Sequence, residues 1–326
     1  MRFCRAVALS STLILLAVGY HYVSAEPPPK PRAIFPVSVG ALRAQLELLA
    51  RSWQFVSRDE LVAAAAGETT LPERACAVTF DDGLRCQVDL ALPVLEELGV
   101  PAIFFVPGQP LAEGRVLHVH KVHALRERVD DAELLELVGA DEVPEDVAVE
   151  HYRYDTPQAA RVKYLLNMAL PADERDRVVG AAFAELFPDE AAFAAELYMS
   201  HDQVRALASS VGAHSYAHEP LALLPPDELD RDLERVTTLL EEITGARPRA
   251  FSYPHGTPST VDVGTARRLA AAGYRVAFTM ERALNRTLDE PLLLGRLDAN
   301  DAPGGKRPLA EIPPARSRYF EEAVPA

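Results

Sequence analysis

Residues 75–83 read ACAVTFDDG, a short and mainly apolar run that ends in two aspartates and a glycine. Such a run predicts a strand buried on both faces, as in parallel sheets. Asp81 and Asp82 then lie at the carboxyl end of that strand, the edge where parallel α/β folds build their active sites. An Asp-Gly pair is also a common turn, so this segment alone leaves site and turn open.

A helix and a second buried strand follow this segment. Asp89–Leu98 has helical character with Gly99 as its stop, and Pro101–Val106 is apolar again. A strand, a loop, a helix and a strand within about thirty residues form a βαβ unit. The alternation resumes after residue 200 and continues to an expected strand over Leu292–Leu297. It predicts parallel strands in an α/β barrel or a doubly wound sheet.

Residues 111–200 interrupt this alternation. They are rich in Ala, Leu and Glu, show helical periodicity and contain no clear buried strand. We interpret them as a helical insertion within a single domain over residues 1–326. Residues 303–326 are rich in Pro and charge, and we expect this tail to be loosely held.

Residues 1–25 allow two interpretations. Two arginines, an apolar stretch over Ala6–Tyr20 and the small residues Ser24 and Ala25 resemble a cleavable signal peptide, which would place the protein outside the cell or in the periplasm. The alternative is a buried first strand over Leu13–Val18. The aromatic residues beside the cleavage site are unusual for a signal, so we favour the strand and a cytoplasmic location.

Composition excludes several classes of protein. The chain has 326 residues, 48% of them apolar, which is enough for a sizeable core. A formal net charge of -15 argues against a nucleic-acid partner, which needs a basic surface. The N-terminal apolar stretch is too short for a stable membrane span. Three cysteines are an odd and sparse set, which argues against a disulfide framework.

His214 and His218 change the interpretation of the aspartate pair. Their i, i+4 spacing lets two imidazoles converge on one ion if the segment makes a helical turn, and they follow a short expected strand, Val211–Ala213. Two imidazoles and one carboxylate form a three-ligand site with open positions, which is typical of catalytic metal centres. The remaining carboxylate is then available to accept a proton. Chance surface histidines are the alternative.

Two weaker groups accompany these motifs. Tyr253-Pro254-His255-Gly256 ends another expected strand, where Gly256 permits a close approach of the backbone to a ligand or forms a plain turn. His118, His120 and His123 are close enough in sequence to suggest a second metal site. They lie between a loop and a helix, and we interpret them instead as solvated or substrate-cap residues.

Together these motifs resemble the polysaccharide deacetylase family, the NodB homology domain of carbohydrate esterase family 4. The resemblance rests on Thr-Phe-Asp-Asp-Gly at 79–83, His-Ser-Tyr-Ala-His at 214–218 and Tyr-Pro-His-Gly at 253–256, in that order. Tyr-His-Tyr-Val at 20–23 is also similar to the first-strand motif of one branch. The resemblance implies a distorted (β/α)7 barrel, TIM-like in outline, with the helical insertion between the second strand and the His-x-x-x-His motif.

The resemblance also implies roles. Asp82, His214 and His218 would bind one divalent metal ion, zinc or else cobalt or nickel, and Asp81 would be the general base. His255 falls where the family uses a backbone N–H to hold the oxyanion. The substrate would be a carbohydrate with N-acetyl groups, in contact with His21, Tyr253, Pro254 and Gly256.

The chain departs from the family pattern at two points. Ser252 and Tyr253 stand where an arginine usually precedes the third motif, and the late Leu-x-x-His that supplies a general acid is absent. We hypothesise that Arg296 replaces the arginine, that Asp298 lines the site, and that the acid is His255 or His21 or is shared with water. Two alternatives remain open: hydrolysis of another non-peptide C–N bond in a small metabolite, and a carbohydrate-binding relic without catalysis.

Overall fold

The computed structural model describes residues 13–28, 32–138, 145–152 and 155–315. A parallel sheet forms its centre, with strand order β10-β1-β5-β6-β7-β8-β9 and β4 added beside β5. These strands are β1 (Ile14–Tyr20), β4 (Gln54–Phe55), β5 (Arg74–Phe80), β6 (Ala102–Val106), β7 (Val211–Ala213), β8 (Ala250–Ser252), β9 (Val276–Phe278) and β10 (Leu297–Asp298). A small second sheet pairs β2 (Val23–Ser24) with β3 (Val37–Ser38).

The sheet curls until its two edges meet. Leu294 forms a parallel bridge with Phe278 of β9, and Leu297 in β10 pairs with Val18 of β1. The predicted distorted barrel is confirmed. The expected strand over Leu292–Leu297 is shorter than predicted, because only the bridge at Leu294 and the pairing from Leu297 onward join the sheet.

β1 lies inside the sheet, between β10 and β5. All seven of its residues pair in register with β5, from Ile14 with Arg74 to Tyr20 with Phe80, and Leu15–Val18 is fully buried. The strand favoured from the sequence is therefore present in the structure. Cleavage after Ala25 would delete it.

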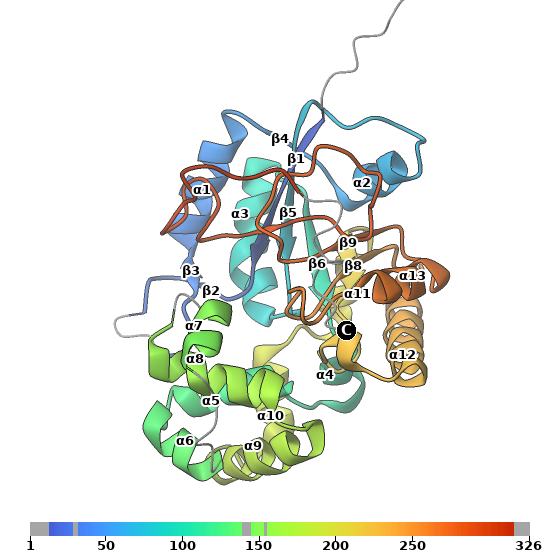
Figure 1. Ribbon diagram of the computed structural model, residues 1–326. Coiled ribbons are helices and arrows are strands. Elements are labelled where there is room, and N and C mark those ends of the chain that lie inside the picture. The colour runs from blue at the N-terminus through green and yellow to red at the C-terminus, as the bar shows by residue number, and fades with distance from the viewer. Residues whose placement is uncertain (1–12, 29–31, 139–144, 153–154, 316–326) are drawn as a thin grey trace, which may run out of the picture.

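Helices cover the outside of the barrel (Figure 1). Ser57 and Glu60 form a capping box at the start of α2 (Arg58–Ala65), and Gly99 ends α3 (Leu92–Leu98) in the left-handed region with φ 64°. These outer helices are α1 (Val39–Ala50), α2 (Arg58–Ala65), α3 (Leu92–Leu98), α11 (His201–Ala206), α12 (Pro226–Thr244) and α13 (Val263–Ala271), with a π-helical turn at Gln87–Ala91 and 3₁₀ turns at Ala208–Ser210 and Leu221–Leu223.

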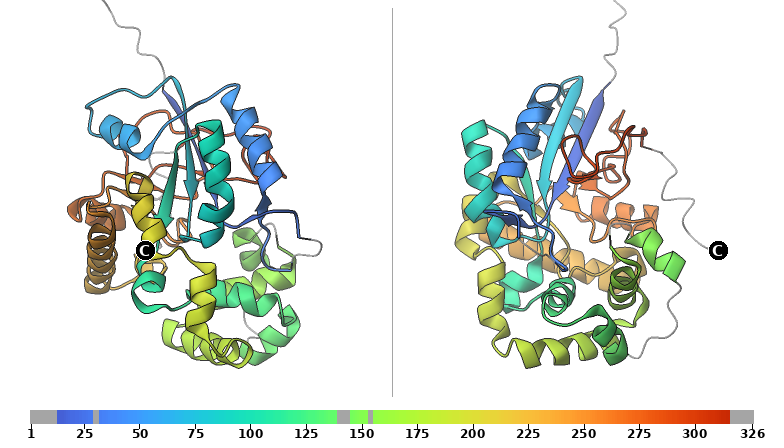
Figure 2. Two further views of the ribbon diagram at one scale, coloured as in Figure 1. Left: turned by 180° about the vertical axis from the view of Figure 1, so that it is seen from behind. Right: turned by 90° about the vertical axis from the view of Figure 1, so that its left-hand side faces the viewer.

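The chain between β6 and β7 is helical and packs against the carboxyl end of the barrel, as Figures 1 and 2 show. The expected helix over Val122–Val138 is two helices, and Arg126 at the end of the first binds Asp131 at the start of the second. The helices are α4 (Gly108–Glu113), α5 (His118–Arg126), α6 (Asp131–Val138), α7 (Glu145–His151), α8 (Pro157–Tyr164), α9 (Ala172–Leu186) and α10 (Glu190–Leu197), with a π-helical turn at Leu165–Ala169.

The C-terminal segment is held more firmly than expected. Leu284 N–H donates to Pro313 O, and Ala315 N–H donates to Leu284 O, each at 2.8 Å. The expectation of a loose tail is wrong for residues 303–315, because backbone hydrogen bonds fix them to the barrel. Residues 316–326 lie outside the described part of the chain. No helix within the described ranges is long and apolar enough to cross a membrane.

Candidate metal centre

The chemically distinctive residues gather at one edge of the barrel. Asp81 and Asp82 follow β5, His214 follows β7 and His21 follows β1. Because these strands are parallel, their carboxyl ends meet at the same edge. The sequence motifs are far apart in the chain, and the topology brings them together.

Asp82, His214 and His218 present ligand atoms to one another. Asp82 Oδ1 lies 3.3 Å from His214 Nε2 and 3.5 Å from His218 Nε2. One ligand atom from each residue lies within 4.8 Å of the others, and all three side chains are buried. One carboxylate oxygen and two imidazole nitrogens form a donor set that suits Zn²⁺ and similar divalent ions.

The hydrogen bonds around His214 define which of its nitrogens faces the site. Its Nδ1 lies 2.7 Å from Ser252 O, and a carbonyl can only accept, so Nδ1 carries the hydrogen. In the neutral ring Nε2 then presents a lone pair toward Asp82. Asp82 Oδ1 is buried and makes no hydrogen bond within the described chain. The lone pairs of Asp82 Oδ1 and of neutral His214 Nε2 therefore point toward one buried region that His218 Nε2 also faces, an arrangement that a cation would stabilise.

Burial and the neighbouring charges shift the pKa values of all three metal-ligand candidates. Burial alone would lower the pKa of His214, but Asp81 and Asp82 outweigh it and raise that pKa. Burial and the adjacent His214 lower the pKa of His218 well below its usual value, so His218 is neutral. Burial would raise the pKa of Asp82, but His120 and His214 hold it well below its usual value. Ionised Asp82 and neutral His218 are the forms that bind metal.

Backbone strain is concentrated here. Four non-glycine residues in the described chain have a positive φ: Asp82 at 75°, Ser215 at 57°, His218 at 60° and His255 at 61°. Each costs on the order of 1 kcal/mol or more and persists only where the surroundings impose it. Two of the four are metal-ligand candidates, and the other two belong to the adjacent motifs. The strained residues of the described chain therefore cluster at the edge of the barrel that carries the metal-ligand candidates.

Asp81 is held by an arginine from the far end of the chain. Arg296 donates from Nη1 to Asp81 Oδ1 at 2.8 Å and from Nη2 to Oδ2 at 2.6 Å, and Ser252 Oγ donates to Oδ2 at 3.1 Å. Arg296 thus makes the contact hypothesised for it. Burial would raise the pKa of Asp81, but Arg296 and His214 outweigh it and lower that pKa. Asp81 is therefore ionised at neutral pH.

The third motif behaves differently from the prediction. Tyr253 was expected to contact substrate, which is wrong, because its side chain is 1% exposed and its hydroxyl donates to Leu292 O at 2.9 Å. Pro254 and Gly256 are buried too and shape the turn. A Cβ added at Gly256 would lie 2.8 Å from Met280 N, so this position requires glycine. The His255 ring lies 5.2 Å from that of His218, centroid to centroid.

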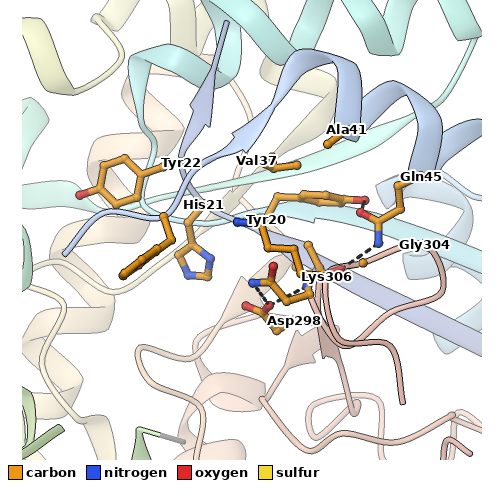
Figure 3. A pocket seen from close by; sticks show the side chains of 14 residues that line it. Tyr20, His21, Tyr22, Val37, Ala41, Gln45, Asp298, Gly304 and Lys306 are labelled. Carbon is orange, nitrogen blue, oxygen red and sulfur yellow. Dashed lines mark hydrogen bonds between the residues drawn. The ribbon is translucent and has the colours of Figure 1, made fainter. Parts of the chain in front are cut away.

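His21 and Asp298 line a neighbouring pocket, shown in Figure 3 with Tyr22 and Lys306. His21 Nε2 lies 3.8 Å from Asp81 Oδ2, and the His21 side chain is 39% exposed. Asp298 Oδ1 accepts hydrogen bonds from the backbone and side-chain nitrogens of Asn300, both at 2.8 Å. His21 therefore connects the pocket to Asp81, whereas Asp298 stabilises the loop that forms one wall.

Two histidines of the insertion are not solvated, which was one of the two interpretations offered for them. His118 and His120 were interpreted as solvated or cap residues, but they are 7% and 1% exposed. His120 Nε2 lies 3.1 Å from Asp82 Oδ2. The available signal was their apolar surroundings in Val116–Val122, which indicates a buried helix face. The solvated interpretation is wrong because α5 packs directly on the site.

Comparisons with known proteins bear on the family of the chain. The polysaccharide deacetylase family profile matches residues 68–139 and 189–277, and the unmatched stretch between them falls within the helical insertion. A comparison with curated proteins finds no match.

Three solved structures illustrate the similarity of fold. The Streptococcus pyogenes deacetylase PplD in complex with acetate is 13% identical, with TM-score 0.56 over 88% of this chain and 92% of that one. IcaB from Ammonifex degensii is 21% identical, with TM-score 0.55 over 87% and 91%. A de-N-acetylase from Aggregatibacter actinomycetemcomitans is 18% identical, with TM-score 0.52 over 87% and 94%. These structures show the fold, and the matching family profile, which spans residues 68–277, shows that the chain belongs to the polysaccharide deacetylase family.

Proposed function

We propose that this chain is a metal-dependent hydrolase that removes N-acetyl groups from an amino sugar within an oligo- or polysaccharide. The observation that carries the proposal is the buried convergence of Asp82 Oδ1, His214 Nε2 and His218 Nε2 beside the ionised Asp81. Family membership and the fold support the reaction class.

Asp82, His214 and His218 would hold the ion. A bound divalent ion would supply Lewis acidity to the amide carbonyl and acidity to water at this edge of the barrel. We propose Zn²⁺, with Co²⁺ or Ni²⁺ as the alternatives, because one carboxylate and two imidazoles accept all three.

Asp81 is the proposed general base. Its lowered pKa keeps it ionised, and Arg296 and Ser252 fix the orientation of its carboxylate. An ionised carboxylate held in this way can take a proton from the attacking water. The guanidinium stabilises the charged form of Asp81 before the reaction, so no side chain has to reorient during the proton transfer.

His21 is the proposed general acid, with His255 as the alternative. An amide nitrogen departs poorly as an anion, so the leaving amine needs a proton. His21 is partly exposed to the pocket of Figure 3 and lies beside Asp81. The proton that Asp81 takes from water could therefore pass to His21 and from there to the leaving amine. The backbone N–H of His255 is proposed to stabilise the oxyanion.

Acetate release from N-acetylated oligosaccharides tests this function directly. Purified protein supplied with Zn²⁺ should release acetate, and Asp81→Asn should lower kcat by about 10²-fold or more, the scale of a lost general base. Asp202→Asn is the matched control, because the Asp202 side chain is 90% exposed. An Asp81→Asn protein with unchanged acetate release would contradict the assigned base.

Substrate size separates the proposal from hydrolysis of a small metabolite. Faster turnover of N-acetylated oligomers than of the monomeric sugar would support a polymer substrate. Hydrolysis of a small C–N compound without any acetate release from sugars would favour the metabolite. Zn²⁺ binding without hydrolysis of either would leave the protein a binding relic.

A further inference from the structure

The helical insertion reaches the metal centre through His120 of α5. Its Nε2 lies 3.1 Å from Asp82 Oδ2, and its side chain has no exposed surface. The opposite ring nitrogen, Nδ1, lies 2.5 Å from the hydroxyl of Tyr198, the residue that follows α10. Two ends of the insertion therefore meet behind the metal-ligand candidate Asp82.

The hydrogen bonds that connect Tyr198, His120 and Asp82 all run in one direction, from donor to acceptor toward Asp82. Leu117 N–H donates to the Tyr198 hydroxyl oxygen at 3.0 Å, so the single hydroxyl hydrogen of Tyr198 is available for His120 Nδ1. A neutral imidazole that accepts at Nδ1 carries its hydrogen on Nε2. An ionised carboxylate can only accept, so this hydrogen is donated to Asp82 Oδ2. The bond to Tyr198 and the bond to Asp82 both require the same tautomer of His120.

This tautomer of His120 determines which carboxylate oxygen of Asp82 is free to bind an ion. His120 cannot be a metal ligand, because one ring nitrogen is protonated and the other accepts from Tyr198. Oδ2 of Asp82 is occupied by His120, while Oδ1 faces His214 and His218 without a hydrogen bond in the described chain. Asp82 is thereby left with one oxygen for the ion.

The hydrogen-bonded series Tyr198–His120–Asp82, called the relay below, is attached to the loop that carries Asp82. Tyr198 forms an antiparallel bridge with Leu84, and Met199 N–H donates to Gly83 O at 2.9 Å. Tyr198 is 4% exposed. The loop that carries Asp82 is therefore held at a fixed distance from Tyr198.

We propose that His120 and Tyr198 are positioning residues that hold Asp82 for single-oxygen coordination, which makes the helical insertion part of the metal centre. The inference rests on the proposed metal site but not on the substrate. Partners of ligand side chains commonly contribute 10- to 100-fold to metal affinity. The insertion is thus more than a cover over the barrel.

Zn²⁺ affinity, measured by competition with a chromophoric chelator, tests the relay without substrate. Tyr198→Phe and His120→Ala should each weaken Zn²⁺ binding about 10- to 100-fold. His120→Gln keeps a donor toward Asp82 and should fall between wild type and His120→Ala. Because the two residues act in series, the double variant should bind about as weakly as His120→Ala alone.

Tyr274→Phe is the matched control. It removes a buried hydroxyl bonded to Thr237 Oγ1 at 2.7 Å, away from the site, and should leave Zn²⁺ affinity unchanged. The visible spectrum of the Co²⁺-loaded protein should change in Tyr198→Phe and stay the same in Tyr274→Phe. The Co²⁺ spectrum reports the ligands around the ion, so a variant that is only less stable would not change it.

Equal Zn²⁺ affinity and equal Co²⁺ spectra in Tyr198→Phe and Tyr274→Phe would overturn the relay. So would independent, multiplying losses in the double variant. Wild-type protein that binds Zn²⁺ tightly but releases no acetate would refute the proposed deacetylation and leave the relay standing. Wild-type protein that binds no Zn²⁺ would instead refute the metal centre itself.

Discussion

Replacing Arg296 by Met should destabilise the protein in a pH-dependent way. Arg296 and Asp81 are 1% and 2% exposed, and the guanidinium donates twice to the carboxylate. Removing one partner of such a buried pair costs about 3–5 kcal/mol, because the other charge stays buried without compensation. Typical domains have only about 5–15 kcal/mol of stability, so the loss is measurable.

Protonation of Asp81 limits this cost and gives it a characteristic pH dependence. Without Arg296 the folded-state pKa of Asp81 rises, and the variant can fold with a neutral carboxyl. The pKa of an aspartate in the unfolded chain is roughly three units below pH 7, and each unit corresponds to about 1.4 kcal/mol. Protonating Asp81 at pH 7 therefore costs about 4 kcal/mol. At pH 5 the same step costs about 1.5 kcal/mol. The difference between wild type and Arg296→Met should therefore shrink by about 2.5 kcal/mol from pH 7 to pH 5.

Urea unfolding at both pH values, with chelator present, measures this difference. Arg231→Met is the matched control, since its pair with Asp227 is 61% and 74% exposed, and it should cost less than about 1 kcal/mol at either pH. In an Asp81→Asn background, Arg296→Met should lose most of its effect. Equal destabilisation by Arg296→Met and Arg231→Met, or a loss that does not change with pH, would refute this account of the pair.

Three further outcomes are expected. Chelation of the metal should lower the thermal midpoint, since an ion at 100 times its Kd adds about 2.7 kcal/mol, and an unchanged midpoint would contradict the site. Gly212→Ala should cost about 1–3 kcal/mol in urea unfolding, because the new Cβ would lie 2.5 Å from the Phe105 ring, whereas Gly180→Ala meets nothing within 4 Å and should be neutral or stabilising. Burial raises the pKa of Asp232 to about 6 although it accepts from Tyr216 N–H. Wild type should therefore lose up to about 3 kcal/mol relative to Asp232→Asn as the pH rises from 4 to 7, and a constant difference would show that this pKa is not raised.

The sequence predicted the barrel because its signals were local. The apolar run before Asp81 and the alternation of helices and strands report directly on burial and period. The ordered motifs predicted which side chains would meet at the strand ends. The contact between Arg296 and Asp81 was reachable only as a hypothesis, since the two residues are 215 positions apart.

Other features depended on packing that no local pattern encodes. Tyr253 follows β8 as its motif predicts, but its ring turns into the core, and a motif does not specify the side of the backbone from which a side chain projects. Of the two interpretations of the α5 histidines, solvated or cap, the solvated one was wrong for His118 and His120, because whether they meet solvent depends on where the insertion packs. The firmness of residues 303–315 likewise comes from hydrogen bonds to a distant segment around Leu284.

The pairing of β1 with β10, two strands from opposite ends of the chain, has a consequence for how the protein is made. A ribosome that adds about 5–20 residues per second needs on the order of 15–60 seconds to reach Leu297 after Val18 has been synthesised. Throughout that time one side of β1 has no strand beside it, and Asp81 has no guanidinium to neutralise it. The nascent chain must therefore keep an unfinished sheet soluble until its last strand emerges, which predicts a dependence on chaperones during synthesis that the finished barrel does not share.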